Sequence, residues 1–302
     1  MKVRKKYILR INNKNYLLGT RTWLMGVINV TPDSFSDGGL YFNKERAVRR
    51  GLELVAAGAD IIDIGGESSR PGSKPISKEE EIKRVIPVIS ALRKQTEALI
   101  SIDTTKSEVA EAALDAGANI LNDISAGRFD PKIIALAVKR KTPLILMHMK
   151  GTPQTMQINP YYQDMLKEIK TFLQERIKVA EARGLEKEKI IIDPGIGFGK
   201  KFEDNLVLIN NLRFLEDLNC PILIGVSRKS FIGQILNLPP HQRLEGTIAA
   251  SILSVINGAH ILRVHDVEPV RRAVQVAEAI LNEKIQWTYP PEQPKEKENY
   301  AG

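Results

Sequence analysis

The sequence predicts an α/β fold, a (β/α)8 TIM barrel with an N-terminal β-hairpin at the bottom of the barrel. The chain has 302 residues, which is near the roughly 250 residues typical of such barrels. Eight short apolar runs alternate along it with segments of helical spacing. These runs are apolar throughout rather than alternating, as in parallel strands buried on both faces. The rival, an open doubly wound sheet, normally has fewer strands, and no G-x-G-x-x-G motif follows the first run.

The hairpin is the first predicted element. Two strand-like runs, Tyr7–Ile11 and Tyr16–Gly19, flank Asn12-Asn13, and Asn is favoured in tight turns. We expect residues 1–20 to cover the bottom of the barrel and residues 1–285 to form a single domain. The last residues, 286–302, are rich in proline and charge, so we expect a flexible tail there.

Strands and helices then follow one another eight times. The predicted strands are Leu24–Asn29, Ile61–Ile64, Leu99–Ile102, Asn119–Leu121, Leu144–Met147, Ile190–Ile192, Ile222–Ile224 and Ile261–Val264. The predicted helices are Lys44–Ala57, Lys78–Thr96, Lys106–Ala116, Pro131–Arg140, Tyr161–Arg183, Asn205–Phe214, Leu244–Asn257 and Pro269–Asn282. Glycine in Ala-Gly-Ala or Gly-Ala recurs where a helix should end, as is common at helix C-termini. Closing eight such units into a barrel leaves no exposed sheet edge.

Composition excludes several classes of protein. Hydrophobic residues make up 43% and charged residues 26%, which is typical of globular proteins. No apolar run approaches the roughly 20 residues of a membrane helix, and the basic start lacks the apolar segment of a signal peptide. We therefore expect a cytoplasmic protein without a membrane partner. The formal charge is +8, but Lys and Arg are interleaved with Glu, so we expect no nucleic-acid partner. The single cysteine, Cys220, is interpreted as a core residue.

Polar and glycine-rich clusters directly follow every predicted strand. In a (β/α)8 barrel these positions meet at one rim, where active sites lie. Each cluster alone has a structural explanation, because Asp can cap a helix and Gly can shape a turn. All eight on one rim indicate a binding site for a polar ring and an anion. The clusters are Asn29–Gly39, Gly65–Gly72, Asp103–Thr105, Asn122-Asp123, His148-Met149, Asp193–Gly199, Ser227–Ser230 and Arg263–Asp266.

The residue types in these clusters favour particular ligands. A carboxylate accepts two parallel N–H bonds from an amidine-like edge, and asparagine can donate and accept beside it. Arg263, His265 and nearby backbone amides favour phosphate or diphosphate. The amide oxygen of Asn29 is a reasonable ligand for Mg2+. HExxH, Cys/His clusters and GxxxxGK[ST] are missing from the sequence, so we expect neither a zinc site nor NTP hydrolysis.

These motifs resemble the dihydropteroate synthase family. The matching segments are GVINVTPDSFSDGG (26–39), DIIDIGGESSRPG (60–72), SIDTTKSEVAEAALDAGANILNDISAG (101–127), LMHMKGTP (146–153), IIDPGIGFGK (191–200), LIGVSRKSFIG (223–233) and RVHD (263–266). They occur in the family's order, span about residues 22 to 282, and are highly specific as a set. The resemblance implies an Mg2+-dependent transferase and a homodimer. Such a transferase would condense (7,8-dihydropterin-6-yl)methyl diphosphate with 4-aminobenzoate to 7,8-dihydropteroate and pyrophosphate, in folate biosynthesis.

The resemblance also implies residue roles. Asn29 would bind the metal. The catalytic residues would be Asp37, Arg70, Lys229, Arg263 and His265. The pterin and its diphosphate would contact Ser69, Asp103, Asn122, Met147, Asp193, Phe198, Gly225, Lys229, Arg263, Val264 and His265. The 4-aminobenzoate pocket would comprise Phe35, Arg70, Pro71, Lys229 and Ser230. The loops Val30–Gly39 and Ser68–Lys74 would act as mobile lids.

Three other functions compete with this interpretation. A methyltetrahydrofolate-dependent methyltransferase on the same barrel would need a corrinoid partner and would not need the NVTPDSF or SRKSF segments. A Schiff-base aldolase would use Lys229, and borohydride trapping would reveal it. A pterin-binding module without catalysis would have no use for a diphosphate site, which Arg263 and His265 indicate.

Overall fold

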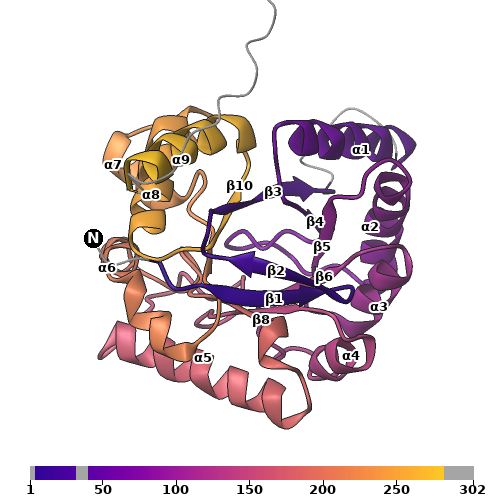
Figure 1. Cartoon of the computed structure of the whole chain (residues 1–302), viewed down its shortest axis with the longest axis horizontal. Coiled ribbons are helices and arrows are strands. Elements are labelled where there is room, and N and C mark those ends of the chain that lie inside the picture. The colour runs from indigo at the N-terminus through magenta and orange to yellow at the C-terminus, as the bar shows by residue number, and fades with distance from the viewer. Residues whose placement is uncertain (1–3, 32–39, 282–302) are drawn as a thin grey trace, which may run out of the picture.

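The computed structural model describes residues 4–31 and 40–281. It shows a ring of parallel strands inside a layer of helices, with a short antiparallel hairpin crossing one end (Figure 1). The barrel strands are β3 (Trp23–Asn29), β4 (Ile61–Gly65), β5 (Leu99–Asp103), β6 (Ile120–Asp123), β7 (Leu144–Met147), β8 (Ile190–Asp193), β9 (Leu223–Ile224) and β10 (Ile261–Val264). The predicted 286–302 tail lies outside the described residues.

The eight strands close on themselves. Their order in the sheet is β8-β7-β6-β5-β4-β3-β10-β9, so every strand pairs with its neighbours around the ring. The two ends of this sheet are joined by a parallel bridge between Ile192 and Ile222, and the Ile192 amide donates to the Pro221 carbonyl at 3.0 Å. The predicted barrel is therefore confirmed, and the pairing that joins β8 to β9 is short, a single bridge.

Helices cover the outside of the ring. They are α1 (Leu40–Ala56), α2 (Lys78–Arg93), α3 (Ser107–Asp115), α4 (Lys132–Arg140), α5 (Met165–Ala182), α6 (Phe202–Asn210), α7 (Ser230–Leu236), α8 (Leu244–Ile256) and α9 (Val267–Leu281). Short 3-10 turns are η2 (Lys187–Lys189), η3 (Leu212–Leu218) and η4 (Pro240–Gln242). The Asp164 side chain accepts from the Lys167 amide, which explains why α5 begins later than the predicted Tyr161. The seven-residue α7 was not predicted, because it is too short for a helical repeat to be visible.

Alternating strand side chains divide the apolar interior into two clusters. Outward-facing residues such as Ile62, Ile100 and Leu262 pack against the helices. Inward-facing residues at the start of the strands, among them Ile61, Ile145 and Ile261, form a second cluster. Cys220 is buried in the first cluster, as expected.

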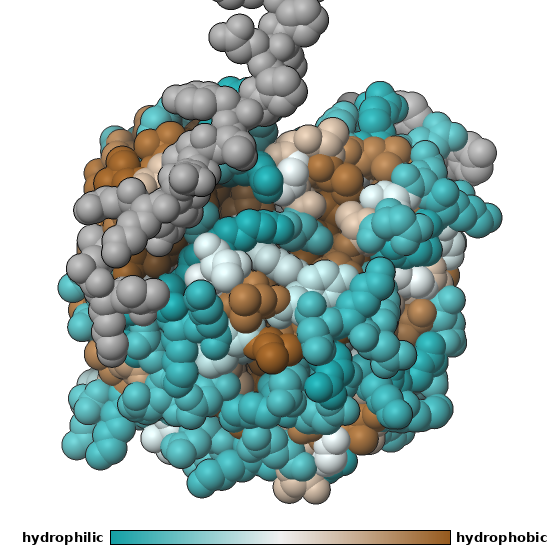
Figure 2. Space-filling model, viewed as in Figure 1, coloured by the Kyte–Doolittle hydropathy of each residue, from teal (hydrophilic) through white to brown (hydrophobic). Residues whose placement is uncertain are grey.

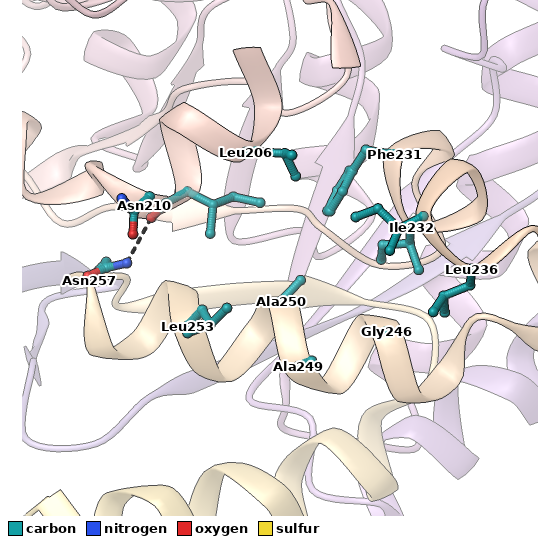
Figure 3. Close-up of a pocket in the computed structure, with 12 residues that line it drawn as sticks. Leu206, Asn210, Phe231, Ile232, Leu236, Gly246, Ala249, Ala250, Leu253 and Asn257 are labelled. Carbon is teal, nitrogen blue, oxygen red and sulfur yellow. Dashed lines mark hydrogen bonds between the residues drawn. The ribbon is translucent and has the colours of Figure 1, made fainter. Parts of the chain in front are cut away.

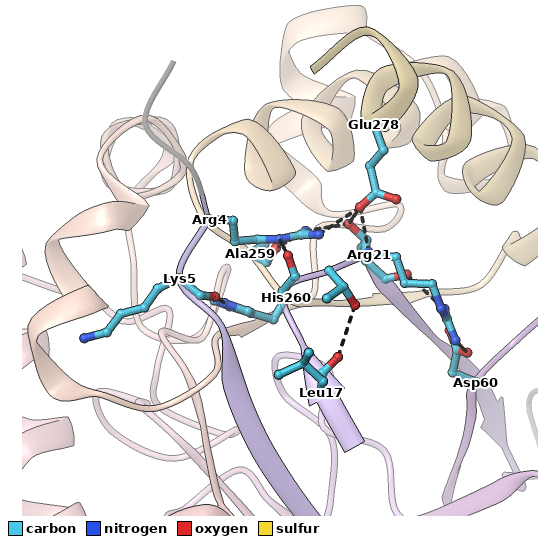
Figure 4. Close-up of polar contacts among 11 residues, drawn as sticks. Arg4, Lys5, Leu17, Arg21, Asp60, Ala259, His260 and Glu278 are labelled. Atoms are coloured by element: carbon cyan, nitrogen blue, oxygen red, sulfur yellow. Dashed lines mark hydrogen bonds and ion pairs between the residues drawn. The ribbon is translucent and has the colours of Figure 1, made fainter. Parts of the chain in front are cut away.

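The hairpin covers the bottom of the barrel, as predicted. Strands β1 (Tyr7–Ile11) and β2 (Lys14–Leu18) pair antiparallel, and Leu9, Ile11 and Leu18 belong to the inward-facing apolar cluster. Polar contacts fasten the chain beside the hairpin to the barrel (Figure 4). Arg4 pairs with Glu278 of α9 at 2.9 Å, and His260 Nε2 lies 2.8 Å from the Lys5 carbonyl. The hairpin thus covers the end of the barrel at which the strands begin.

Candidate active site

The interior of the barrel changes from apolar at the bottom to polar at the mouth. Residues two positions apart on a strand share a face, so four inward polar residues stand above inward isoleucines. The pairs are Ile61 and Asp63, Ile120 and Asn122, Ile191 and Asp193, and Ile261 and Arg263. The fold itself therefore brings the predicted site residues of β6, β8 and β10 to one place.

Arg263 lies at the centre of this polar layer. Its Nε donates to Asp63 Oδ2 at 2.6 Å, and its Nη2 donates to Asp103 Oδ2 at 2.7 Å. Burial disfavours the charge of Arg263, but the two carboxylates outweigh it and raise the pKa of the guanidinium. The Asn122 amide also donates to Asp63 Oδ2, at 3.2 Å. Predicted residues from three strands thus form one connected network.

Asp63 is the member of this network that the sequence analysis missed. It is completely buried, and it accepts from both the arginine and the asparagine. The signal was present, because a charged residue interrupted the otherwise apolar run Ile61–Ile64. A carboxylate within a buried strand requires a partner, and Arg263 and Asn122 provide it.

Two carboxyl groups at the mouth have raised pKa values. Burial raises the pKa of Asp193 from 3.8 to about 6, and one of its oxygens accepts from the Gly195 amide at 2.7 Å. Burial also raises the pKa of Asp103, against the opposing effect of Arg263. Hydrogen bonds hold one oxygen of Asp103 and one of Asp193, so each carboxyl group has a second oxygen to offer a ligand.

A cationic and an apolar wall face these acids. Lys229 Nζ lies 4.4 Å from the centre of the Phe198 ring, a cation–π arrangement. Burial lowers the pKa of Lys229 to about 8. Phe198 belongs to an apolar cluster with Met147 and two further methionines. Gly197 lies directly beside Lys229, since a Cβ built there would be in van der Waals contact with the lysine Cδ at 3.4 Å. These groups provide a surface on which a flat ring can stack.

Residues after β9 and β10 complete the rim. The Ser227 hydroxyl accepts from the His265 backbone amide at 3.2 Å and lies 3.0 Å from His265 Nδ1. If the hydroxyl proton is directed to Nδ1, the ring proton is on Nε2, where it can be donated to a ligand. Burial and the nearby Arg263 lower the pKa of His265 to about 4. His265 is therefore neutral near pH 7 and can serve a phosphate as a hydrogen-bond donor. Gly225 follows β9 beside Arg263.

The side chain of Val264 cannot make the predicted contact with the pterin or diphosphate. Its side chain is fully buried in the outer apolar cluster against the helices, because it alternates with the inward Arg263. Only its backbone can face the mouth.

The loop residues are less completely assembled. Ser69 lines a small cavity together with Asp103, whereas Arg70 and Pro71 are exposed. Ser230 is also exposed, at the start of α7, and Asn29 ends β3 half-buried. The predicted Asp37 and Phe35 lie outside the described residues. The structure thus brings the deep half of the predicted site together and leaves the outer half open.

A buried lysine supports the glycine-rich loop from behind, and it was also missed. Lys200 is 2% exposed. Its Nζ lies 3.0 Å from His148 Nδ1 and 3.1 Å from the Phe198 carbonyl. Burial lowers the pKa of Lys200 to about 7 and that of His148 to about 2. His148 is therefore neutral and accepts from Lys200, which in turn donates to the Phe198 carbonyl. Its role is structural.

Known proteins resemble this chain both in sequence and in structure. The profile of the pterin binding enzymes matches residues 25–265. A dihydropteroate synthase of Synechocystis is 48% identical over 263 residues, which cover 87% of this chain and 91% of the relative. The structure of Xanthomonas albilineans dihydropteroate synthase with 4-aminobenzoic acid aligns with a TM-score of 0.86 at 44% identity, covering 92% of this chain and 99% of that one.

A second structure of the Xanthomonas albilineans enzyme, in complex with 7,8-dihydropteroate, aligns with a TM-score of 0.80 at 43% identity. The alignment covers 88% of this chain and 96% of that one. The similarity therefore extends over nearly the whole barrel, including every strand that contributes a residue to the polar mouth.

Proposed function

The chain belongs to the pterin binding enzymes and, among them, to the dihydropteroate synthases, and we propose from this premise how its residues carry out the reaction. It is a transferase that condenses (7,8-dihydropterin-6-yl)methyl diphosphate with 4-aminobenzoate to give 7,8-dihydropteroate and pyrophosphate. The observation that supports the residue roles best is the single mouth shared by Asp193, Arg263 and Lys229.

The pterin ring would bind deepest. Its aminopyrimidine edge presents several N–H donors, which suit the free oxygens of Asp103 and Asp193. The Asn122 side chain is oriented by its donation to Asp63, and its amide oxygen can accept from the ring. Met147 and Phe198 would pack on the ring face, with Lys229 at the carbonyl side and Gly225 leaving room for the plane. Ser69 would add a hydrogen bond from the rim.

The diphosphate would lie above Arg263. One edge of its guanidinium is held by Asp63 and Asp103, and the remaining N–H groups are free to donate to phosphate oxygens. Neutral His265 would add one donor from Nε2, and the Val264–His265 backbone could contribute as well. These groups stabilise the negative charge that grows on the leaving diphosphate as the C–O bond breaks.

A magnesium ion fits this mouth as a companion of the diphosphate. Within residues 4–31 and 40–281, no three His, Cys, Asp or Glu side chains are arranged to hold a metal. Mg2+ commonly takes most of its ligands from water and substrate phosphates, so the Asn29 amide oxygen is a sufficient protein contribution. When bound, the ion would neutralise diphosphate charge.

The bond changes follow from this arrangement. The electron pair of the methylene C–O bond leaves with the diphosphate, and the aniline nitrogen of 4-aminobenzoate forms the new C–N bond and loses a proton. We propose a dissociative course in which positive charge on the pterin methylene is stabilised by Asp103 and Asp193. Arg70, Pro71, Lys229, Ser230 and Phe35 would enclose 4-aminobenzoate. Closure of the loops, with Asp37, would exclude water from the cation.

Purified protein supplied with the pterin diphosphate, 4-aminobenzoate and Mg2+ is expected to form 7,8-dihydropteroate and release one pyrophosphate per product. Liquid chromatography of the pteroate and a coupled pyrophosphate assay would measure both products. Omitting 4-aminobenzoate is the control and should prevent pteroate formation. If methyltetrahydrofolate and a corrinoid protein gave methyl transfer while the condensation did not occur, the competing methyltransferase would replace this function.

We also propose that the enzyme is a homodimer joined through α6, α7 and α8. These helices enclose an apolar groove of about 340 Å3 (Figure 3), lined by Leu206, Phe231, Ile232, Ile235, Leu236 and Leu253 among others. Ile235 and Leu253 are 57% and 53% exposed. On the visible face, brown residues gather over the region of α7, α8 and α9, whereas most of that face is hydrophilic (Figure 2). A large exposed apolar patch favours a protein partner, and a second copy would bury it symmetrically.

Replacing Leu253 with glutamate is expected to convert the dimer to a monomer, because a charge would be buried in the apolar contact. Sedimentation velocity at micromolar concentration would distinguish the 33.7 kDa chain from its dimer. Leu17→Glu is the matched control, since Leu17 is similarly exposed, at 49%, but lies on the hairpin. A wild-type monomer, or a dimeric Leu253→Glu variant, would disprove this interface.

We place the enzyme in the cytoplasm, together with its small-molecule substrates. Among the described helices, none is long and apolar enough to cross a membrane. Fractionation of cells with an antibody to the untagged protein would test this location.

A further inference from the structure

Three charged side chains outside the polar mouth form a cluster at the base of the β4–α2 loop (residues 66–77). Lys106, just before α3, contacts Glu67 of the loop and lies 2.6 Å from Glu81 of α2. The cluster therefore joins two consecutive βα units, β4–α2 and β5–α3. We call Glu67, Glu81 and Lys106 the loop-base cluster.

Burial makes Lys106 a fixed point within this cluster. The Glu81 side chain is 1% exposed, and its second oxygen, Oε1, is buried without a hydrogen-bond partner. Burying a carboxylate without a partner is strongly unfavourable, so Glu81 needs the ammonium group of Lys106. The lysine is thereby held in place from below, and Glu67 docks on a cation that is already immobile. Arg84 of α2 adds a second tie, because it donates to the Gly66 carbonyl at 3.0 Å.

The loop-base cluster adjoins the active site. Glu67 and Glu81 line the same small cavity as Ser69 and Asp103, and Lys106 follows Asp103 by three residues. Beyond this base the loop is held at its far side, where the Gly72 amide donates to the Pro153 carbonyl at 3.0 Å. Gln154 Nε2 also donates to the Ser73 carbonyl there, at 3.1 Å. Exposed Arg70 and Pro71 lie between the base and this far side.

We infer that Glu67 and Lys106 are positioning residues for the arylamine substrate. Their ion pair fixes the start of the β4–α2 loop. The residues that follow, Ser69, Arg70 and Pro71, then close over 4-aminobenzoate from a fixed position. The ion pair contacts none of the deep residues Asp193, Asn122 and Lys229. The deep pterin contacts therefore do not depend on it, and only the rim contact of Ser69 does. This inference rests on the proposed function.

Glu67→Ala is the direct test, because it releases the loop while Glu81 keeps its partner. We expect the KM for 4-aminobenzoate to rise about tenfold, since an untethered loop must be ordered when the substrate binds. We expect kcat and the Kd for the pterin, measured by calorimetry without 4-aminobenzoate, to change less than about twofold. Glu67→Gln should recover part of the loss, since its amide oxygen still accepts from Lys106.

Glu108→Ala is the matched control. It removes the exposed ion pair between Lys78 and Glu108, which joins the same helices, α2 and α3, at 2.7 Å. We expect every kinetic constant of this variant to match wild type. Lys106→Met alone can unfold the protein by leaving Glu81 unpaired, so Lys106→Met/Glu81→Gln is used in its place and should show the same KM increase as Glu67→Ala.

Hydrogen exchange of residues 66–74 gives a readout that does not depend on catalysis. Faster exchange there in Glu67→Ala, with unchanged exchange in the barrel strands, supports the tether. An unchanged KM for 4-aminobenzoate, or an equal loss of pterin affinity, overturns it. A wild-type protein that forms no pteroate disproves the proposed function instead, so the two failures are distinguishable.

Discussion

Replacing Arg263 with methionine is expected to abolish turnover and to destabilise the fold by about 3–5 kcal/mol, the range for breaking a buried ion pair by removing one partner. Asp63 is fully buried beneath the guanidinium, and the weak donation from Asn122 cannot replace a cation. Asp103 loses the same partner. Chemical denaturation monitored by circular dichroism would measure the change in unfolding free energy, and calorimetry would measure loss of pyrophosphate binding.

A double variant separates the two roles of Arg263. In Arg263→Met the Asp63 carboxylate is left buried without a cation, whereas in Arg263→Met/Asp63→Asn that charge is removed. The stability of the double variant should therefore largely return, while its activity should not. Arg21→Met is the matched control, because Arg21 makes a bidentate pair with Asp60 but is 48% exposed at the opposite end of the barrel. Its loss should change stability by roughly 0–1 kcal/mol and leave turnover intact. An Arg263→Met variant as stable as wild type would show that Asp63 does not need this cation.

Replacing Asp193 with asparagine is expected to weaken pterin binding at least about 100-fold. The charge-assisted hydrogen bond from the ring to the free carboxylate oxygen is lost, and an amide NH2 group faces the N–H donors of the ring instead. The shape is preserved, and the amide oxygen can still accept from the Gly195 backbone. In the wild type, affinity for the pterin should fall as the pH drops below about 6, where Asp193 becomes protonated. Calorimetric titrations between pH 5 and 8 would follow this change. The variant should keep only the part of it that comes from Asp103, whose pKa is also raised by burial. Wild-type affinity in the variant would remove Asp193 from the site.

Asp193 should also limit stability, with a definite dependence on pH. Its pKa is raised by burial from 3.8 to about 6 in the folded protein. Between these values the unfolded chain releases its proton first, so the contribution of Asp193 to stability is present below pH 3.8 and is lost as pH rises through 6. At pH 8 the Asp193→Asn variant should be more stable than wild type by on the order of 2–3 kcal/mol.

The difference between the variant and wild type should disappear near pH 4. Thermal denaturation at pH 8 and pH 4 would test whether the difference in stability disappears, and a variant less stable than wild type at pH 8 would contradict the prediction. Natural active sites often retain such unfavourable groups because function requires them.

The barrel was predictable because its determinants are local. A run such as Ile190–Ile192 followed by Asp193 indicates both a buried strand and the position where that strand ends. Repeating this pattern eight times leaves few topologies, since parallel strands must be joined by helical crossovers. The seven-residue α7 was missed because so short a helix shows little periodicity, and α6 was predicted too late because a 3-10 turn follows it.

The site was predictable only to the level of which residues reach the mouth. The sequence predicts which residues reach the mouth, and the strands bring them together there: Asp103, Asn122, Asp193, Lys229 and Arg263. What they contact was not predictable, because Arg263 and Asp63 are 200 residues apart in the sequence. The positions of Asp37 and Phe35 stay predictions.

The sequence by itself determined the order of strands and helices, the bottom hairpin, and the acids, amide and cations that gather at one rim. Only the tertiary structure decided that Asp63 supports Arg263, that His265 is neutral, that Val264 faces away from the site, and that Lys106 ties a loop to two helices. The physical reason is that hydrophobic periodicity acts between residues a few positions apart. Ion pairing and desolvation instead depend on groups that become neighbours, and lose water, only when the ring of strands closes.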